Sequence, residues 1–304
     1  MKARRLFLGM LAGNAVGALA CALAAGLTAL AHELAALVLY PSLLLIPFAI
    51  GLMASWLWKP LTLGIGATLF HSLSCTLLGL GAAWLFMREG IVCLLIVSPI
   101  LYLGTVAGAL TGRVWFRKNL DRLNLCLAPI FFFAVAAEPT LRGSHTGVVT
   151  DEILIAAPPS KVWPHVLAFP EIPDAPDYWL FRAGLPYPTE TVNGGNFVGA
   201  GRACRFSGGA VFKEKVAEFV PQRLLTFDIV ESPPDPELLG HLDAHRGQFE
   251  LRDNGDGTTT LIGRTWYSLH VRPASYFDWW THDIFRAVHL RVMKHVKRLS
   301  ESGG

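Results

Sequence analysis

The chain has 304 residues, of which 52% are hydrophobic and 16% charged, and its mean hydropathy is +0.42. These values exclude an ordinary soluble globular protein, in which about 25% of residues are charged. Residues 1–145 hold ten Lys and Arg against four Asp and Glu, a net charge of +6, whereas the remainder carries a net charge of −3. The overall charge of +3 therefore gives no reason to expect a nucleic-acid partner.

Four long uncharged stretches fill the first part of the chain, at residues 6–31, 34–58, 61–87 and 91–112. Each exceeds the roughly 20 apolar residues that cross about 30 Å of hydrocarbon. We therefore predict an α-helical membrane bundle over residues 1–140. A fifth stretch, residues 123–137, contains Pro129 and reaches only about 22 Å as a helix, so it either crosses with local thinning or lies in the interface.

Basic residues indicate the orientation of this bundle. Lys2, Arg4 and Arg5 at the N-terminus, Lys59, and a basic run at residues 113–122 alternate with connections that are poorer in Lys and Arg. By the positive-inside rule the N-terminus is cytoplasmic. We expect an integral protein of a bacterial inner (plasma) membrane. We favour five spans, which place the C-terminal part outside the cytoplasm; four spans would keep it inside.

Two glycine stripes predict close helix packing in the bundle. Gly9, Gly13 and Gly17 are spaced by four residues, and so are the later glycines Gly104, Gly108 and Gly112. Such spacing lets two helix backbones approach closely, either within one chain or in a homodimer. No Asp, Glu, Lys or Arg lies in the middle of the four clear stretches. Ion-coupled carriers usually keep such groups there, so transport is disfavoured.

The rest of the chain, residues 147–304, has the pattern of an α+β domain. A strand over 148–156 is broken by two prolines before a short helix over 161–169. After a Pro-rich loop come β-like runs at 201–207, 210–220, 224–231, 247–252 and 258–271. Asn254 to Gly257 form a hairpin turn between the last two runs. The chain closes with an amphipathic helix over 274–300.

Two residues are candidates for acid–base chemistry. Period-two alternation places Glu214 on the face shared by Phe212 and Val216, either facing a cavity or meeting water at an edge. His289 borders the apolar stripe of the last helix, where it is either a satisfied core histidine or a group facing a cavity. The imidazoles and carboxylate at His241, Asp243 and His245 could bind zinc, but we favour a structural or gating loop and expect no metal.

The C-terminal part resembles a known superfamily. The resemblance covers roughly residues 148–300 and rests on the order of elements, on the Ala157–Trp163 segment A-P-P-S-K-V-W, and on a glycine-rich run at 194–201. Further segments at 181–188, 204–207, 241–243, 265–267 and 289–295 also match. Together they resemble the START-like helix-grip (SRPBCC) superfamily, and within it the membrane-anchored branch labelled polyketide cyclase/dehydrase-like. The resemblance implies a curved antiparallel sheet around a long C-terminal helix, with a hydrophobic cavity between them.

The resemblance implies apolar ligands without fixing a reaction. We expect the domain to bind or carry a lipid-like or polyketide-like hydrophobic small molecule beside membrane lipids, with no cofactor. The alternatives are a cyclase or dehydratase that uses Glu214 and His289, and a sensory or partner-binding module. The residues expected to contact the ligand are Phe206, Phe212, Glu214, His241, Phe249, Trp266, Phe285 and His289.

Overall fold

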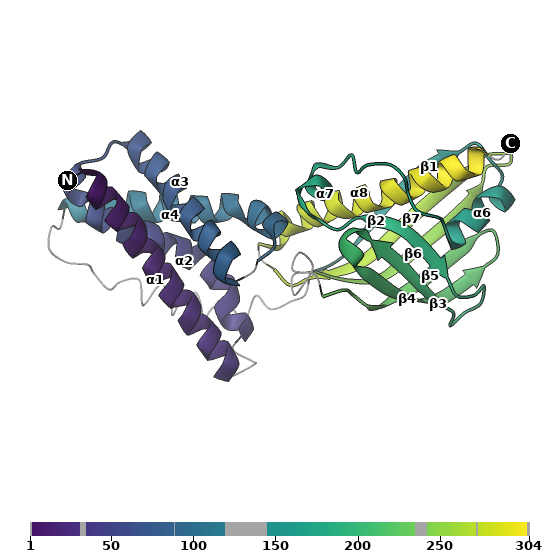
Figure 1. Cartoon of the computed structure of the whole chain (residues 1–304), viewed down its shortest axis with the longest axis horizontal. Helices are drawn as coiled ribbons and strands as arrows, with labels where there is room; N and C mark the ends of the chain where they lie inside the picture. Colours follow the sequence, from purple (N-terminus) through teal and green to yellow (C-terminus); the bar gives the residue numbers. More distant parts are fainter. Residues whose placement is uncertain are drawn as a thin grey trace. The chain divides into compact units, whose positions relative to one another are not determined.

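The computed structural model describes residues 2–30, 35–87, 89–118, 145–234, 242–271 and 273–302. The chain divides into two compact units, Met1–Gly143 and Ser144–Gly304, which Figure 1 draws in purple to blue and in teal to yellow. The sequence places the corresponding boundary at residues 140–147. Each unit is described below by itself.

The first unit consists of long apolar helices. They are α1 (Lys2–Leu30), α2 (Ala35–Trp58), α3 (Ile65–Ala82) and α4 (Ile91–Lys118), with the short segments η2 (Lys59–Leu61) and η3 (Ala83–Met87). In the described residues, four helical segments are long and apolar enough to cross a membrane. Large apolar side chains such as Phe70 and Leu103 point outward and are 66% exposed, which is compatible with a surface that faces lipid. The fifth stretch predicted at 123–137 lies outside the described residues.

Both glycine stripes pack against α2. A Cβ atom at Gly13 of α1 would lie 2.6 Å from the carbonyl oxygen of Ile50, and one at Gly108 of α4 would lie 1.9 Å from the carbonyl oxygen of Phe48. Of the two arrangements expected from the sequence, the structure has the contact within the chain. A homodimer through these faces would have to displace α2. A side-chain amide, that of Asn14, also donates to the carbonyl oxygen of Cys75 at 3.2 Å and so joins α1 to α3.

The second unit is a seven-stranded antiparallel sheet that curls around a long helix (Figure 1). The strands run in the order β1-β7-β6-β5-β4-β3-β2. They are β1 (His145–Ile155), β2 (Pro188–Asn193), β3 (Gly201–Phe206), β4 (Val211–Val220), β5 (Leu224–Glu231), β6 (Leu242–Asp253) and β7 (Thr259–Leu269). The helices are α6 (Pro159–Leu167), α7 (Trp179–Ala183) and α8 (Ala274–Glu301), with the short turn η5 (Ser207–Gly209). This architecture confirms the predicted helix-grip fold.

Alternation along the strands builds the core between the sheet and α8. Ile155 and Leu261 point inward from β1 and β7 and pack with Met293 and Val296 of the helix, all of them buried. A glycine makes the close approach possible, because a Cβ atom at Gly263 would lie 3.1 Å from the sulfur of Met293. Because Gly263 has no side chain, α8 lies close enough to the sheet for the polar side chains of the helix to reach β1 and β7.

Three features of this unit differ from the sequence prediction. The segments α7 and β2 lie in what the sequence indicates as a Pro-rich loop. Pro188 is the first residue of β2, an edge strand, which is where a strand tolerates proline. In addition, β6 begins at Leu242, five residues earlier than predicted, so the segment of Asp243 and His245 is a strand rather than a loop.

Candidate functional site

A cavity of about 210 Å³ lies between α8 and the inner face of the sheet. Its apolar walls include Phe169, Leu185, Pro186, Pro188, Phe206, Phe212, Phe227, Ile229, Phe249, Ile284, Phe285, Val288 and Val292. Polar side chains in the lining include Thr191, Arg202, Cys204, Glu214, Gln248, Thr265 and His289. Ser232 after β5 and Leu242 at the start of β6 also line it, so the cavity extends to the end of the sheet at which β1 begins.

Most residues expected from the sequence to contact a ligand lie on this cavity. They are Phe206, Phe212, Glu214, Phe249, Phe285 and His289. Trp266 requires a correction, because Thr265 and Tyr267 take the inward positions of β7, where they bond to α8, and Trp266 therefore lies on the opposite face of the strand. His241 lies outside the described residues.

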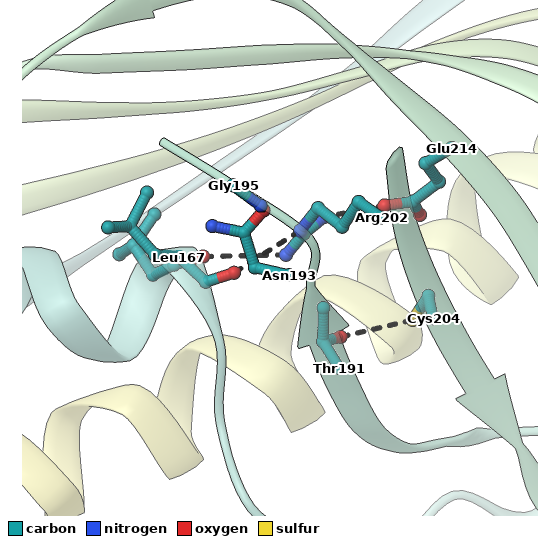
Figure 2. Close-up of polar contacts among 8 residues, drawn as sticks. Leu167, Thr191, Asn193, Gly195, Arg202, Cys204 and Glu214 are labelled. Carbon is teal, nitrogen blue, oxygen red and sulfur yellow. Dashed lines mark hydrogen bonds and ion pairs between the residues drawn. The ribbon is translucent and has the colours of Figure 1, made fainter. Parts of the chain in front are cut away.

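An ion pair is buried in the cavity wall. Arg202 of β3 and Glu214 of β4 are directly opposite each other in the ladder, and a guanidinium nitrogen lies 2.6 Å from a carboxylate oxygen. Only 2% and 6% of these side chains are exposed. Figure 2 shows the guanidinium extended between Glu214 and the carbonyl oxygen of Leu167, which it approaches to 3.4 Å. The guanidinium carbon also lies 4.5 Å from the ring centre of Phe227.

This ion pair bears on whether Glu214 can act in acid–base chemistry. Burial raises the pKa of its carboxyl group, while the charge and hydrogen bond of Arg202 oppose that rise. Because the carboxylate is bound to a guanidinium, it is not free to accept a proton from a ligand. The neighbouring Cys204 is a free thiol that accepts a hydrogen bond from Thr191 (Figure 2), and burial raises its pKa to about 12. The bound guanidinium disfavours Glu214 as a base, and the raised thiol pKa disfavours Cys204 as a nucleophile.

The second polar cluster joins three elements of the fold. The ring of His289 on α8 lies with Nδ1 2.9 Å from a carboxylate oxygen of Asp151 on β1, and with Nε2 2.8 Å from the hydroxyl of Thr265 on β7. Asp151 and Thr265 point from the sheet toward α8, where His289 lies between them. The sequence left open whether His289 is a satisfied core residue, and its partners are two side chains rather than a backbone carbonyl.

Sequence reasoning missed the partners in both clusters. Arg202 shares the inward face of β3 with Cys204 and Phe206, and Asp151 shares the inward face of β1 with Val149 and Ile153. Period-two alternation, applied to these strands as it was to β4, places both charged residues toward the core. Each would then have required a partner, because unpaired charges are rarely buried.

The zinc hypothesis gains no support from the strand that carries two of its three residues. Asp243 accepts a hydrogen bond from His270 at 2.7 Å, and His245 lies 2.7 Å from the hydroxyl of Ser268. Across residues 2–118 and 145–302, apart from the undescribed gaps, no three His, Cys, Asp or Glu side chains gather as a metal site requires.

A curled antiparallel sheet that holds a C-terminal helix over an apolar cavity defines a helix-grip domain. Residues 146–296 match the protein family described as "Polyketide cyclase / dehydrase and lipid transport". The match covers the C-terminal unit and leaves the apolar helices outside it. The fold and the match to this family together support a hydrophobic ligand-binding helix-grip domain.

Solved structures with a similar fold include norcoclaurine synthase from Thalictrum flavum in complex with dopamine and hydroxybenzaldehyde. It is 15% identical, with 54% of this chain and 94% of that chain covered and a TM-score of 0.37. A second is the Zhui aromatase/cyclase from Streptomyces sp. R1128, which is 14% identical, covers 52% and 93% of the two chains, and has a TM-score of 0.33. No curated protein matched the chain. Likenesses at this level do not identify a ligand.

Proposed function

We propose that the C-terminal domain binds a hydrophobic small molecule in its cavity and that the N-terminal helices hold the domain at a membrane, with which it exchanges this ligand. The observation that carries the proposal is the apolar cavity between α8 and the sheet. Buried apolar walls with a few polar groups are typical of small-molecule sites. Tethering to the bilayer raises the effective concentration of the domain at lipid without any new contact.

The size of the cavity limits the ligand. A dry cavity of about 150 Å³ holds benzene, and this cavity measures about 210 Å³. One small ring system or a short acyl segment fits this volume, whereas a whole phospholipid does not. A lipid ligand would therefore place one apolar segment inside and leave its head group at the opening.

Exposed tryptophans support exchange with a bilayer. Trp179 of α7 and Trp279 of α8 are 49% and 62% exposed. The ring centre of Trp280 lies 6.2 Å from that of Trp179 and 4.8 Å from that of Trp279. His145, the first residue of β1, lies 2.9 Å from Asp278 in the same part of α8. The aromatic group is thus at the end of the domain where the chain arrives from the apolar helices. Tryptophan prefers the interface between lipid and water.

A cavity-filling substitution tests ligand binding. We expect Val288→Trp, which puts an indole into the cavity, to remove most of the apolar species that co-purify with the wild-type chain. The measurement is native mass spectrometry of the detergent-solubilised full chain, followed by solvent extraction and mass analysis of the bound molecules. A loss of about tenfold or more corresponds to about 1.4 kcal/mol of binding free energy.

Val230→Trp is the matched control, because Val230 of β5 is 61% exposed while its neighbour Ile229 lines the cavity. This variant should retain the wild-type ligands. Equal ligand content in Val288→Trp and wild type would contradict binding in the cavity.

The membrane topology is open to a separate test. If residues 123–137 cross the bilayer, the chain has five spans and its C-terminus lies outside the cytoplasm. Alkaline phosphatase fused after Gly304 should then be active, and a green fluorescent protein fused at the same place should be dark. The reverse pattern would show that 123–137 does not cross and that the ligand-binding domain is cytoplasmic.

A further inference from the structure

We propose that Asp151, His289 and Thr265 form a proton relay that acts as a general base on a carbon acid bound in the cavity. This inference rests on the proposed ligand-binding function and deepens it, because it assigns a chemistry to one wall of the same cavity. His289 and Thr265 both line the cavity. Asp151 contacts the ring of His289 from β1 and positions it.

The hydrogen bonds fix the direction in which a proton moves. A carboxylate is only an acceptor, so the Nδ1–H of His289 donates to Asp151 across 2.9 Å. In the neutral ring Nε2 is then the acceptor, and the hydroxyl of Thr265, 2.8 Å away, donates to it. The imidazolium that forms on proton uptake is stabilised by Asp151, whose side chain is only 7% exposed and which also lies 3.7 Å from Arg286.

The arrangement favours proton transfer over acyl transfer. Both reactions use a hydroxyl, an imidazole and a carboxylate in series. Acyl transfer also needs free N–H donors beside the nucleophile, which stabilise the negatively charged oxygen of the intermediate. Thr265 is paired with Val149 of β1 on one side and with Gly247 of β6 on the other, so its backbone is committed to two ladders. Deprotonation instead leaves the negative charge on a ligand oxygen that is not bonded to Thr265, so this oxygen need not lie beside the committed backbone of Thr265.

The step balances without a cofactor. A C–H bond beside a ligand carbonyl breaks and its proton moves to Oγ1 of Thr265, while the hydroxyl proton of Thr265 moves to Nε2 of His289. The C–H electron pair becomes a C=C bond, and the carbonyl oxygen takes the negative charge. Return of the proton to the same carbon gives exchange, and return to a conjugated carbon shifts a double bond. Nothing is oxidised or reduced in either case.

Deuterium exchange into a small carbon acid tests the relay. The probe is 2-tetralone, an apolar two-ring ketone, incubated in D₂O with the full chain in lipid nanodiscs. Proton NMR follows the loss of the signals beside the carbonyl, and saturation transfer reports binding in the same sample. General-base catalysis contributes about 10²- to 10⁴-fold, so we expect Thr265→Val, His289→Gln and Asp151→Asn to lose at least about 10²-fold in exchange while still binding the probe.

Two further variants separate catalysis from structure. Thr265→Ser keeps the hydroxyl and should exchange the probe within about tenfold of wild type, although it loses the methyl group that Thr265→Val retains. Glu152→Gln is the matched control for Asp151→Asn, because Glu152 is the next residue of β1, lies on the outer face and is exposed. It should behave as wild type. A purely structural role would lower the thermal stability of the variants without separating exchange from binding.

The outcomes distinguish the two proposals. If the probe binds but exchanges at the buffer rate with wild-type protein, or equally fast with wild type and Thr265→Val, the relay is wrong and ligand binding stands. If the probe does not bind, the binding of small apolar ligands is wrong and the relay falls with it. Exchange that depends on all three residues, and that serine restores at position 265, supports both.

Discussion

Replacing Arg202 by Met is expected to lower the free energy of unfolding of the C-terminal unit by about 3–5 kcal/mol. The substitution keeps the apolar length of the side chain but removes the charge, so the carboxylate of Glu214 stays buried without its partner at 2.6 Å. A loss of this size is a large part of the roughly 5–15 kcal/mol that stabilise a domain. Urea unfolding of the purified chain, followed through its tryptophans, measures it.

The same variant should show a defined pH dependence. Burial raises the pKa of Glu214, and the opposing effect of Arg202 is lost in Arg202→Met, so the folded-state pKa rises further above the value of about 4.3 of the unfolded chain. The folded state then binds the proton more tightly. Stability is therefore retained below about pH 4 and lost as the pH rises through the folded-state pKa. The variant should be closest to wild type in acid and furthest from it at neutral pH.

Two companion variants isolate the pair. Arg246→Met breaks the exposed pair of Arg246 with Asp228, whose side chains are 48% and 44% exposed, and should cost no more than about 1 kcal/mol. The double variant Arg202→Met/Glu214→Leu replaces both buried charges by apolar groups and should recover most of the lost stability. If the double variant is as unstable as Arg202→Met alone, the loss does not come from an uncompensated charge.

Local patterns predicted the elements on which both clusters lie. Alternation in β4 placed Glu214 on the same face as Phe212, because the period of a strand is a property of adjacent residues, but it left open whether this face meets a cavity or water; in the structure both residues line the cavity. It could not name Arg202 as the partner of Glu214, because that contact depends on the register of β3 against β4, which pairs positions 202 and 214. Cross-strand register is set by the whole sheet.

The error at Trp266 has the same origin. Thr265, Trp266 and Tyr267 are consecutive strand-forming residues, so their composition does not indicate which face is inward. In the structure Tyr267 donates a hydrogen bond to Asp278 of α8, and this contact places the odd-numbered positions of β7 inward. A shift of one residue moves every side chain of a strand to the other face. Because Trp266 was expected to face the ligand, its neighbour Thr265, the third member of the Asp151–His289–Thr265 cluster, was not singled out.

A large loss of stability in the N-terminal unit is expected from Gly108→Leu. A Cβ atom at Gly108 would lie 1.9 Å from the carbonyl oxygen of Phe48 and 2.9 Å from the amide nitrogen of Leu52, both backbone atoms of α2. Backbone cannot move aside as a side chain can, so the cost should exceed the roughly 1–3 kcal/mol of ordinary overpacking. Thermal unfolding of the detergent-solubilised chain should show the transition of the helices lowered or lost.

Gly81→Leu is the matched control, because a Cβ atom at Gly81 of α3 meets nothing within 4 Å. Both substitutions replace a helical glycine and so raise intrinsic helix propensity by a similar amount, roughly 0.5–1 kcal/mol. The difference between the two variants therefore reports the contact of α4 with α2 alone. Because the C-terminal unit is compact by itself, its own transition should stay at the wild-type temperature in both. Equal melting of the helices in Gly108→Leu and Gly81→Leu would mean that α4 does not pack on α2 through its glycine stripe.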